Sequence, residues 1–195
     1  MDSERAHDVA AAPLVERLSL RFCPDALQTA LQTVLSRHPF NHNNQVCLTH
    51  RAGDLTAIER AYEGTGHLWD PKIGDFRHSE FDYSQFNLDF ADTYFSEVFS
   101  GLSEAFAVGR SRLMLCRSRT CYSLHHDMSR YRYHIALRTN PGCWLVYPNR
   151  GNYHIPADGH LYRVVATELH SAMNAGATDR VHLVLEARVK VLAPS

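Results

Sequence analysis

The sequence predicts an all-β core with supporting helices, arranged as a helix-supported β-sandwich or jelly roll. Three observations predict it: apolar residues at helical spacing up to about residue 107, short β-rich runs from residue 112 onward, and turn residues between those runs. Several short strands behind a helical layer are typical of such folds. At 195 residues, we expect a single domain over 1–195, in which 1–107 supply mainly helical support and a substrate loop and 108–192 form the β core.

Two helices are predicted in the first 107 residues. Pro24 and Asp25 begin a segment with apolar residues at helical spacing, and Pro39 ends it. The second helix covers 91–106, where the apolar residues form one stripe that is typical of core packing. Between them, 64–90 has little periodicity and contains loop-forming glycines and prolines. This segment is either a candidate substrate lid or a plain surface excursion.

The remainder of the chain contains the predicted strands. They cover 112–118, 131–138, 143–148, 161–166 and 180–191. Asn140-Pro141-Gly142 and Ala157-Asp158-Gly159 are the turn residues between them.

Charge and cysteine content limit the compartment and the partners. The formal net charge is −1, so no global field favours nucleic acid or an anionic membrane. No apolar run approaches the roughly 18 residues of a membrane span, and residues 1–5 lack the basic start of a signal peptide. The five cysteines are an odd number without a CxxC pair, which fits reduced thiols. We expect a cytoplasmic protein without nucleic-acid or membrane partners; the oligomeric state is not indicated.

A candidate metal site begins at His125-His126-Asp127. With 13 histidines and 21 acidic residues, about one or two His-x-acid matches arise by chance, and His78-Ser79-Glu80 is a second match. Residues two apart on a strand share a face, so His125 and Asp127 can reach one metal ion while His126 points away. Two histidines and a carboxylate are the ligand set of non-haem Fe(II) sites, although zinc accepts the same ligands.

The two longest predicted strands each have one polar and one apolar face. Arg132 and His134 share a face of 131–138, and Arg180, His182 and Glu186 share a face of 180–191. These polar faces are either a solvent surface or a polar pocket inside a roll whose apolar faces pack on the helices.

Four segments in order resemble the aspartyl/asparaginyl β-hydroxylase family, a branch of the Fe(II)/2-oxoglutarate-dependent oxygenases. They are 124–127, 131–140, 169–176 and 179–184, within roughly residues 110–190. The resemblance implies a double-stranded β-helix (jelly roll, cupin-like) that uses Fe(II), 2-oxoglutarate and O2. It implies hydroxylation of an unactivated carbon in an amino acid or amino-acid-derived small molecule or peptide substrate, with succinate and CO2 as co-products.

Residue by residue, the resemblance assigns the site. His125, Asp127 and His170 match the iron ligands. Arg180, ten residues after the distal histidine, matches the partner of the remote carboxylate of 2-oxoglutarate. Arg132 and His134 match an Arg-x-His motif near the carboxylate that chelates iron. Met114 falls near the place of a serine that helps to hold 2-oxoglutarate in the family.

Two other functions use the same residues. One is a metal-dependent hydrolase or isomerase on a cupin-like fold, which lacks an obvious general base beyond the ligands and leaves Arg180 without a role. The other is a non-catalytic binding module, against which the complete ligand triad argues.

Overall fold

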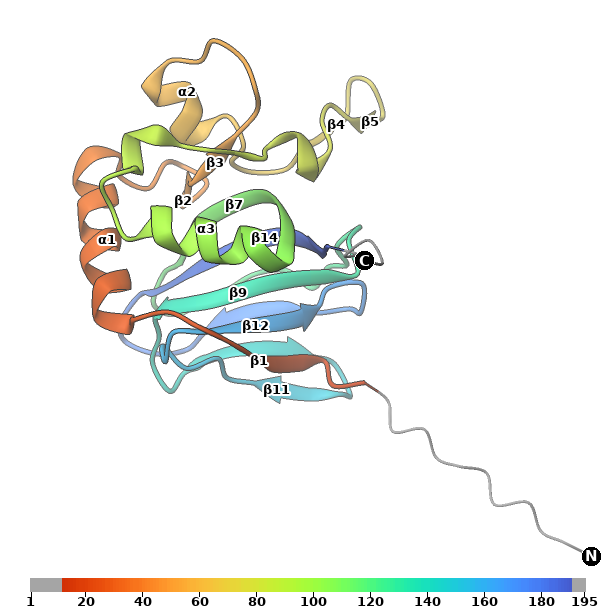
Figure 1. Ribbon diagram of the computed structural model, residues 1–195. Helices are drawn as coiled ribbons and strands as arrows, with labels where there is room; N and C mark the ends of the chain where they lie inside the picture. Colours follow the sequence, from red (N-terminus) through yellow and green to blue (C-terminus); the bar gives the residue numbers. More distant parts are fainter. Residues whose placement is uncertain (1–11, 191–195) are drawn as a thin grey trace, which may run out of the picture.

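The computed structural model describes residues 12–190 as two antiparallel β-sheets with helices on the outer side of the larger sheet (Figure 1). The expected all-β core with supporting helices is confirmed. The larger sheet has the order β1-β12-β9-β14-β7-β2, formed by Val15–Arg21, His160–Val165, Tyr131–Arg138, Arg180–Val189, Phe106–Cys116 and Gln45–Cys47. The smaller sheet has the order β11-β10-β13-β8, formed by Gly151–Tyr153, Cys143–Tyr147, Ser171–Asn174 and Thr120–Cys121.

The helices cover one face of the larger sheet. They are α1 (Pro24–Arg37), α2 (Ala57–Tyr62) and α3 (Phe95–Ala105). Figure 1 shows α1 and α3 beside the strands, and α1 ends two residues before Pro39, as expected from the restricted backbone before a proline. No helix within residues 12–190 is long and apolar enough to cross a membrane.

The main hydrophobic core lies between these helices and the larger sheet. Apolar residues of α1 and α3 pack there against one face of β9 and β14, including Ile135 and Leu183. The alternation in these strands therefore sends the apolar side chains to the helices and the polar ones to the other side of the sheet. A second, smaller core joins the two sheets through residues such as Ala136, Leu145 and Val164.

The segments before and after α2 form short elements, of which β3 and η1 contact β7. β3 (Thr49–His50) pairs with β6 (Gln85–Phe86), and β4 (Trp69–Asp70) pairs with β5 (Asp75–Phe76). The 3-10 helices η1 (Glu80–Asp82) and η2 (Leu88–Phe90) complete the segment. Figure 1 shows β4 and β5 as a hairpin at the upper right.

Several boundaries differ from the prediction. The helix predicted over 91–106 begins at Phe95, because Thr93 closes a turn with Phe90 and its hydroxyl accepts a hydrogen bond from the Phe95 N–H at 3.3 Å. The following strand begins at Phe106 instead of residue 112. The last strand ends at Val189. Its predicted end at residue 191 and the predicted end of the β core at residue 192 lie outside the described residues, as do residues 1–5, which were compared with a signal peptide.

Five strands of the two main sheets, β1, β2, β8, β11 and β13, were not predicted from the sequence. β1 and β2 come from the first 107 residues, which are therefore less helical than expected, and they form the two edges of the larger sheet. The other three belong to the smaller sheet, and none of them is longer than four residues. Such short or edge strands are defined by their pairing partners more than by their own residues.

We predict that Leu183→Ala lowers the free energy of unfolding by about 2–5 kcal/mol, because it removes a fully buried side chain of β14 that packs on the helices. Val189→Ala, at the 65% exposed end of the same strand, should change it by less than about 0.5 kcal/mol. Urea unfolding measures both values. Equal losses in the two variants would contradict the placement of the core.

Candidate metal centre

The candidate metal ligands come from two segments that backbone hydrogen bonds hold together. The N–H of His125 donates to the carbonyl of His170 at 2.9 Å, and the N–H of His170 donates back at 3.0 Å. The N–H of Asp127 donates to the carbonyl of Ala166 at 2.8 Å. Two segments more than forty residues apart in sequence thus place their side chains on one spot.

His125, Asp127 and His170 form a group that fits one metal ion. Their candidate ligand atoms all lie within 4.8 Å of one another. Nδ1 of His125 lies 2.9 Å from the carbonyl of Ser123, and Nδ1 of His170 lies 2.8 Å from the carbonyl of Glu168. A carbonyl only accepts, so each Nδ1 carries the proton and each Nε2 lone pair is left for a metal.

The carboxylate of Asp127 also has an oxygen to spare. Its Oδ2 accepts from Nε of Arg132 at 2.9 Å, which leaves Oδ1 for a metal ion. Burial lowers the pKa of His170, so this imidazole is neutral and able to ligate at neutral pH. The ring of Tyr147 stacks on it with centroids 5.7 Å apart, which fixes its orientation.

The other histidines near the triplets do not join this group. His126 also lines the cavity, its Nδ1 lies 2.9 Å from the carbonyl of Thr167, and it is outside the ligand group; that its side chain points away from the metal stays a prediction. His78, of the second triplet, lines the same cavity without belonging to the candidate ligand group.

The group lies in the wall of a cavity of about 940 Å³ between the two sheets and the segment 66–82. The polar faces of β7, β9 and β14 line it, so of the two interpretations of these faces the polar pocket inside the roll is correct. The segment predicted as lid or surface excursion forms part of the cavity wall, and Trp69 and Phe76 of its hairpin are half exposed there.

Arg180 lies in the cavity wall beside two buried histidines. It is 6% exposed, and its Nη2 lies 2.8 Å from Nδ1 of His182. Nδ1 of His182 in turn lies 3.3 Å from Nδ1 of His134. Burial, followed by the charge of Arg180, holds the pKa of both histidines well below the usual value, so both are neutral. No carboxylate of the described residues forms an ion pair with Arg180.

Arg132 bonds three carboxylates. Its Nε donates to Asp127 at 2.9 Å, its Nη2 donates to Glu80 at 2.9 Å, and its Nη1 donates to Glu186. Asp127 belongs to the candidate metal group, Glu80 to the segment 66–82, and Glu186 to β14.

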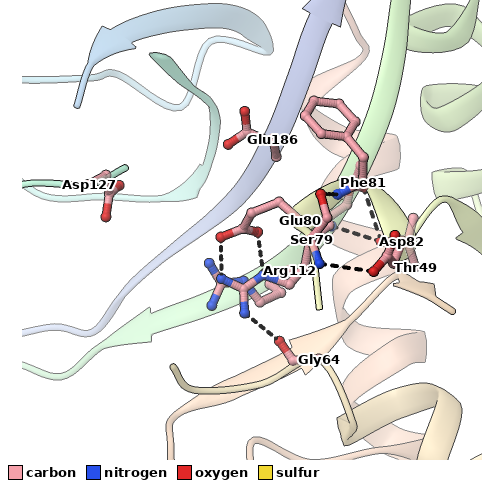
Figure 2. Close-up of polar contacts among 12 residues, drawn as sticks. Thr49, Gly64, Ser79, Glu80, Phe81, Asp82, Arg112, Asp127 and Glu186 are labelled. Carbon is pink, nitrogen blue, oxygen red and sulfur yellow. Dashed lines mark hydrogen bonds and ion pairs between the residues drawn. The ribbon is translucent and has the colours of Figure 1, made fainter. Parts of the chain in front are cut away.

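Glu80 was not predicted as a site residue, although it belongs to the second His-x-acid triplet. It bonds Arg110 of β7 through Nε at 2.5 Å and Nη2 at 2.7 Å. In Figure 2 its carboxylate points towards the arginines of β7, of which Arg112 is labelled. A β-carbon at Gly109 would lie 2.8 Å from the Glu80 carbonyl, so this glycine allows η1 to pack directly on β7.

No model of a known protein family matches this chain, and no curated relative matches it. Among solved structures, the chain is similar to the viral collagen prolyl hydroxylase vCPH from Paramecium Bursaria Chlorella virus-1. A truncated form has a TM-score of 0.54 at 8% identity, over 98% of this chain and 97% of that chain. Its 2-oxoglutarate complex has a TM-score of 0.51 at 7% identity, over 92% and 98%.

A third similar structure is AviO1 from Streptomyces viridochromogenes Tue57, with a TM-score of 0.47 at 16% identity over 93% of this chain and 91% of that chain. The likeness to the viral hydroxylase establishes the fold. The chain is a double-stranded β-helix, or jelly roll, as the sequence predicted.

We predict that Glu80→Gln lowers the free energy of unfolding at pH 7 by roughly 2–4 kcal/mol, because it leaves two buried arginines short of a partner. Burial raises the pKa of Glu80, but the charges of Arg132 and Arg110 outweigh it and lower the pKa from 4.5 to about 2. The stability that the ionised carboxylate contributes is therefore full above pH 4.5 and disappears as the pH falls towards 2.

Urea unfolding of the wild type and Glu80→Gln at pH 7 and pH 3 measures this. The difference between them should shrink at pH 3, while Glu97→Gln, at an exposed position of α3, should behave like the wild type at both pH values. A difference that is the same at both pH values would contradict the ionised state of Glu80.

Proposed function

We propose that the protein is an Fe(II)/2-oxoglutarate-dependent dioxygenase. It hydroxylates an unactivated carbon of an amino acid or amino-acid-derived substrate, free or within a peptide, and releases succinate and CO2. The observation that carries this proposal is the group His125, Asp127 and His170 in the wall of a cavity inside a double-stranded β-helix. A complex of vCPH, which has the same fold, contains 2-oxoglutarate, and this supports the choice of co-substrate.

The three side chains suit Fe(II) in particular. Two imidazole nitrogens and one carboxylate oxygen leave coordination positions free, which is typical of non-haem iron oxygenases. Bound Fe(II) would supply the activation of O2 and of the carbon–hydrogen bond. The backbone carbonyls of Ser123 and Glu168 would keep the two imidazoles in the tautomer that binds metal.

Arg180 is the proposed partner of the remote carboxylate of 2-oxoglutarate. Its guanidinium is buried in the cavity wall and faces neutral histidines instead of an acid. A buried arginine without a counter-charge favours an anion, and its planar fork fits a carboxylate with two hydrogen bonds. The assignment of Arg132 and His134 to the carboxylate that chelates iron stays a prediction. Both residues line the cavity.

The chain's own residues would orient the reactants and limit the access of water. Arg132 holds the carboxylate of Asp127 in place, which leaves the other oxygen free to ligate. The segment 66–82 covers the cavity from the side of β7 and includes Trp69 and Phe76.

The five cysteines are all free, which supports the proposed cytoplasmic location.

Succinate release tests the proposal directly. Purified protein is loaded with Fe(II) and given 2-oxoglutarate, O2 and a panel of free amino acids and peptides. We expect succinate that depends on both iron and 2-oxoglutarate. The absence of 2-oxoglutarate binding and of succinate across the panel would reject the proposal, as would activity with Zn(II) alone on a hydrolysable substrate.

For the metal, we predict that His125→Ala abolishes tight Fe(II) binding while His126→Ala retains it, since only His125 belongs to the ligand group. Metal content after gel filtration, with Mn(II) as a redox-stable substitute, measures this. Loss of binding in His78→Ala in place of His125→Ala would show that the ligands are misassigned.

For the co-substrate, Arg180→Ala should weaken 2-oxoglutarate binding about ten- to a hundredfold, because it removes a charge-assisted pair. Arg180→Lys, which keeps the charge but loses the fork, should lie between this variant and the wild type. Arg138→Ala is the matched control, at an exposed arginine that pairs with β14 from β9. Calorimetric titration with metal-loaded protein gives the affinities; an unchanged value in Arg180→Ala would rule out the assignment.

A further inference from the structure

Arg112 of β7 is a buried guanidinium for which no described residue supplies an ion-pair partner. It is 7% exposed and lines the cavity. Its Nη1 donates to the side-chain oxygen of Gln45 at 3.0 Å and to the carbonyl of Gly66 at 3.4 Å. Its Nε is buried without a hydrogen-bond partner.

The acids nearby already have other partners. Glu80 bonds Arg110 and Arg132, and Glu186 bonds Arg132. Burial and then the charge of Arg110 lower the pKa of Arg112 to about 9, and the charge of Glu80 opposes this only in part. Arg112 is thus still a cation at neutral pH, and no carboxylate of the described residues forms an ion pair with it.

The position of Arg112 separates it from Arg180. Arg112 pairs with Val184 of β14, and Arg180 pairs with Cys116 of β7. The Cα atoms of Arg112 and Cys116, four residues apart on β7, are therefore separated by roughly 13 Å at about 3.3 Å per residue. One carboxylate of 2-oxoglutarate is proposed at the metal and the other at Arg180, so the co-substrate leaves no anion for Arg112.

We propose that Arg112 binds a carboxylate of the substrate, so that the protein acts on carboxylic acids. Burying an unpaired charge is costly, and a carboxylate that accepts from Nη2, which donates to no described residue, would supply the missing counter-charge. Met114 and Val184 line the cavity next to Arg112 and provide an apolar surface for the carbon chain of such an acid. This inference rests on the proposed function for the binding of 2-oxoglutarate at Arg180 and for the statement that the bound acid is then hydroxylated.

Paired acids and amides provide the probe. Protein saturated with Mn(II) and 2-oxoglutarate is titrated in a calorimeter with free amino acids and simple aliphatic acids, each beside its primary amide. The acids that bind should bind about ten- to a hundredfold more tightly than their amides, as expected for a charge-assisted pair.

Three variants assign the preference to this residue. Arg112→Met keeps a long side chain without the charge and should abolish the acid preference. Arg112→Lys should keep part of it. Arg188→Met is the matched control, because Arg188 lines the cavity but is exposed and lies 4.0 Å over the ring of Phe81. This control should keep the preference, which separates a local pair from the general charge of the cavity.

Thermal unfolding adds a second readout. Because Arg112 has no counter-charge in the described structure, Arg112→Met should unfold at the same temperature as the wild type or at a higher one. A purely structural role predicts the opposite, a lower midpoint together with an unchanged acid preference.

The outcomes separate this inference from the oxygenase proposal. Acid-selective binding without any succinate release would support the inference and reject the oxygenase. Succinate release with acids and amides equally effective would reject the inference alone. It would also be rejected if no acid of the panel binds, or if Arg112→Met keeps the preference.

Discussion

The structure around the cavity depends on one guanidinium. Arg132 of β9 bonds a candidate metal ligand, Asp127, an acid of the neighbouring strand, Glu186, and an acid of the covering segment, Glu80. A buried arginine is tolerated when all its donors find acceptors, and here three carboxylates from separate segments provide them. Because the partners come from separate parts of the chain, the ion pairs connect the segment that contains Asp127, the larger sheet and the segment 66–82. Removal of any one acid leaves charge uncompensated in a mostly buried place.

The cavity also contains positive charge that the described residues do not balance. Arg132 and Arg110 share the acids, whereas Arg112 and Arg180 face amide, carbonyl or imidazole groups. Hydrophobic residues of similar volume are often neutral or stabilising in place of buried charges. Stability alone therefore does not account for two such arginines, whereas the two proposed carboxylates would supply their counter-charges. Arg180 lies opposite Cys116, four residues along β7 from Arg112, and the proposals assign one carboxylate to each of these two arginines.

Much of the core and of the metal group could be predicted from local pattern. Strand 131–138 was predicted with its bounds, because strict alternation fixes which side chains face the helices. His125, Asp127 and His170 come together as predicted. Glu80 could not be singled out, because its place depends on the approach of η1 to β7 at Gly109, a long-range contact without a periodic pattern. The missing ion-pair partner of Arg112 could not be predicted for a related reason. It lies in a predicted strand, but only the tertiary structure shows that neighbouring arginines take the available acids.

The metal group depends on backbone pairing as much as on ligand identity. His125 and His170 face each other because their N–H and carbonyl groups exchange two hydrogen bonds, next to the pairing of β13 with β8 and β10. Successive side chains point to opposite faces of a strand, so a slip of one residue would turn His125 and Asp127 away from His170. The register of the smaller sheet therefore decides which histidine of the adjacent pair can bind a metal. The hydrogen bonds from Nδ1 to backbone carbonyls then leave Nε2 of each histidine as the nitrogen that can bind the metal. The geometry of the site therefore depends on the backbone as well as on the side chains.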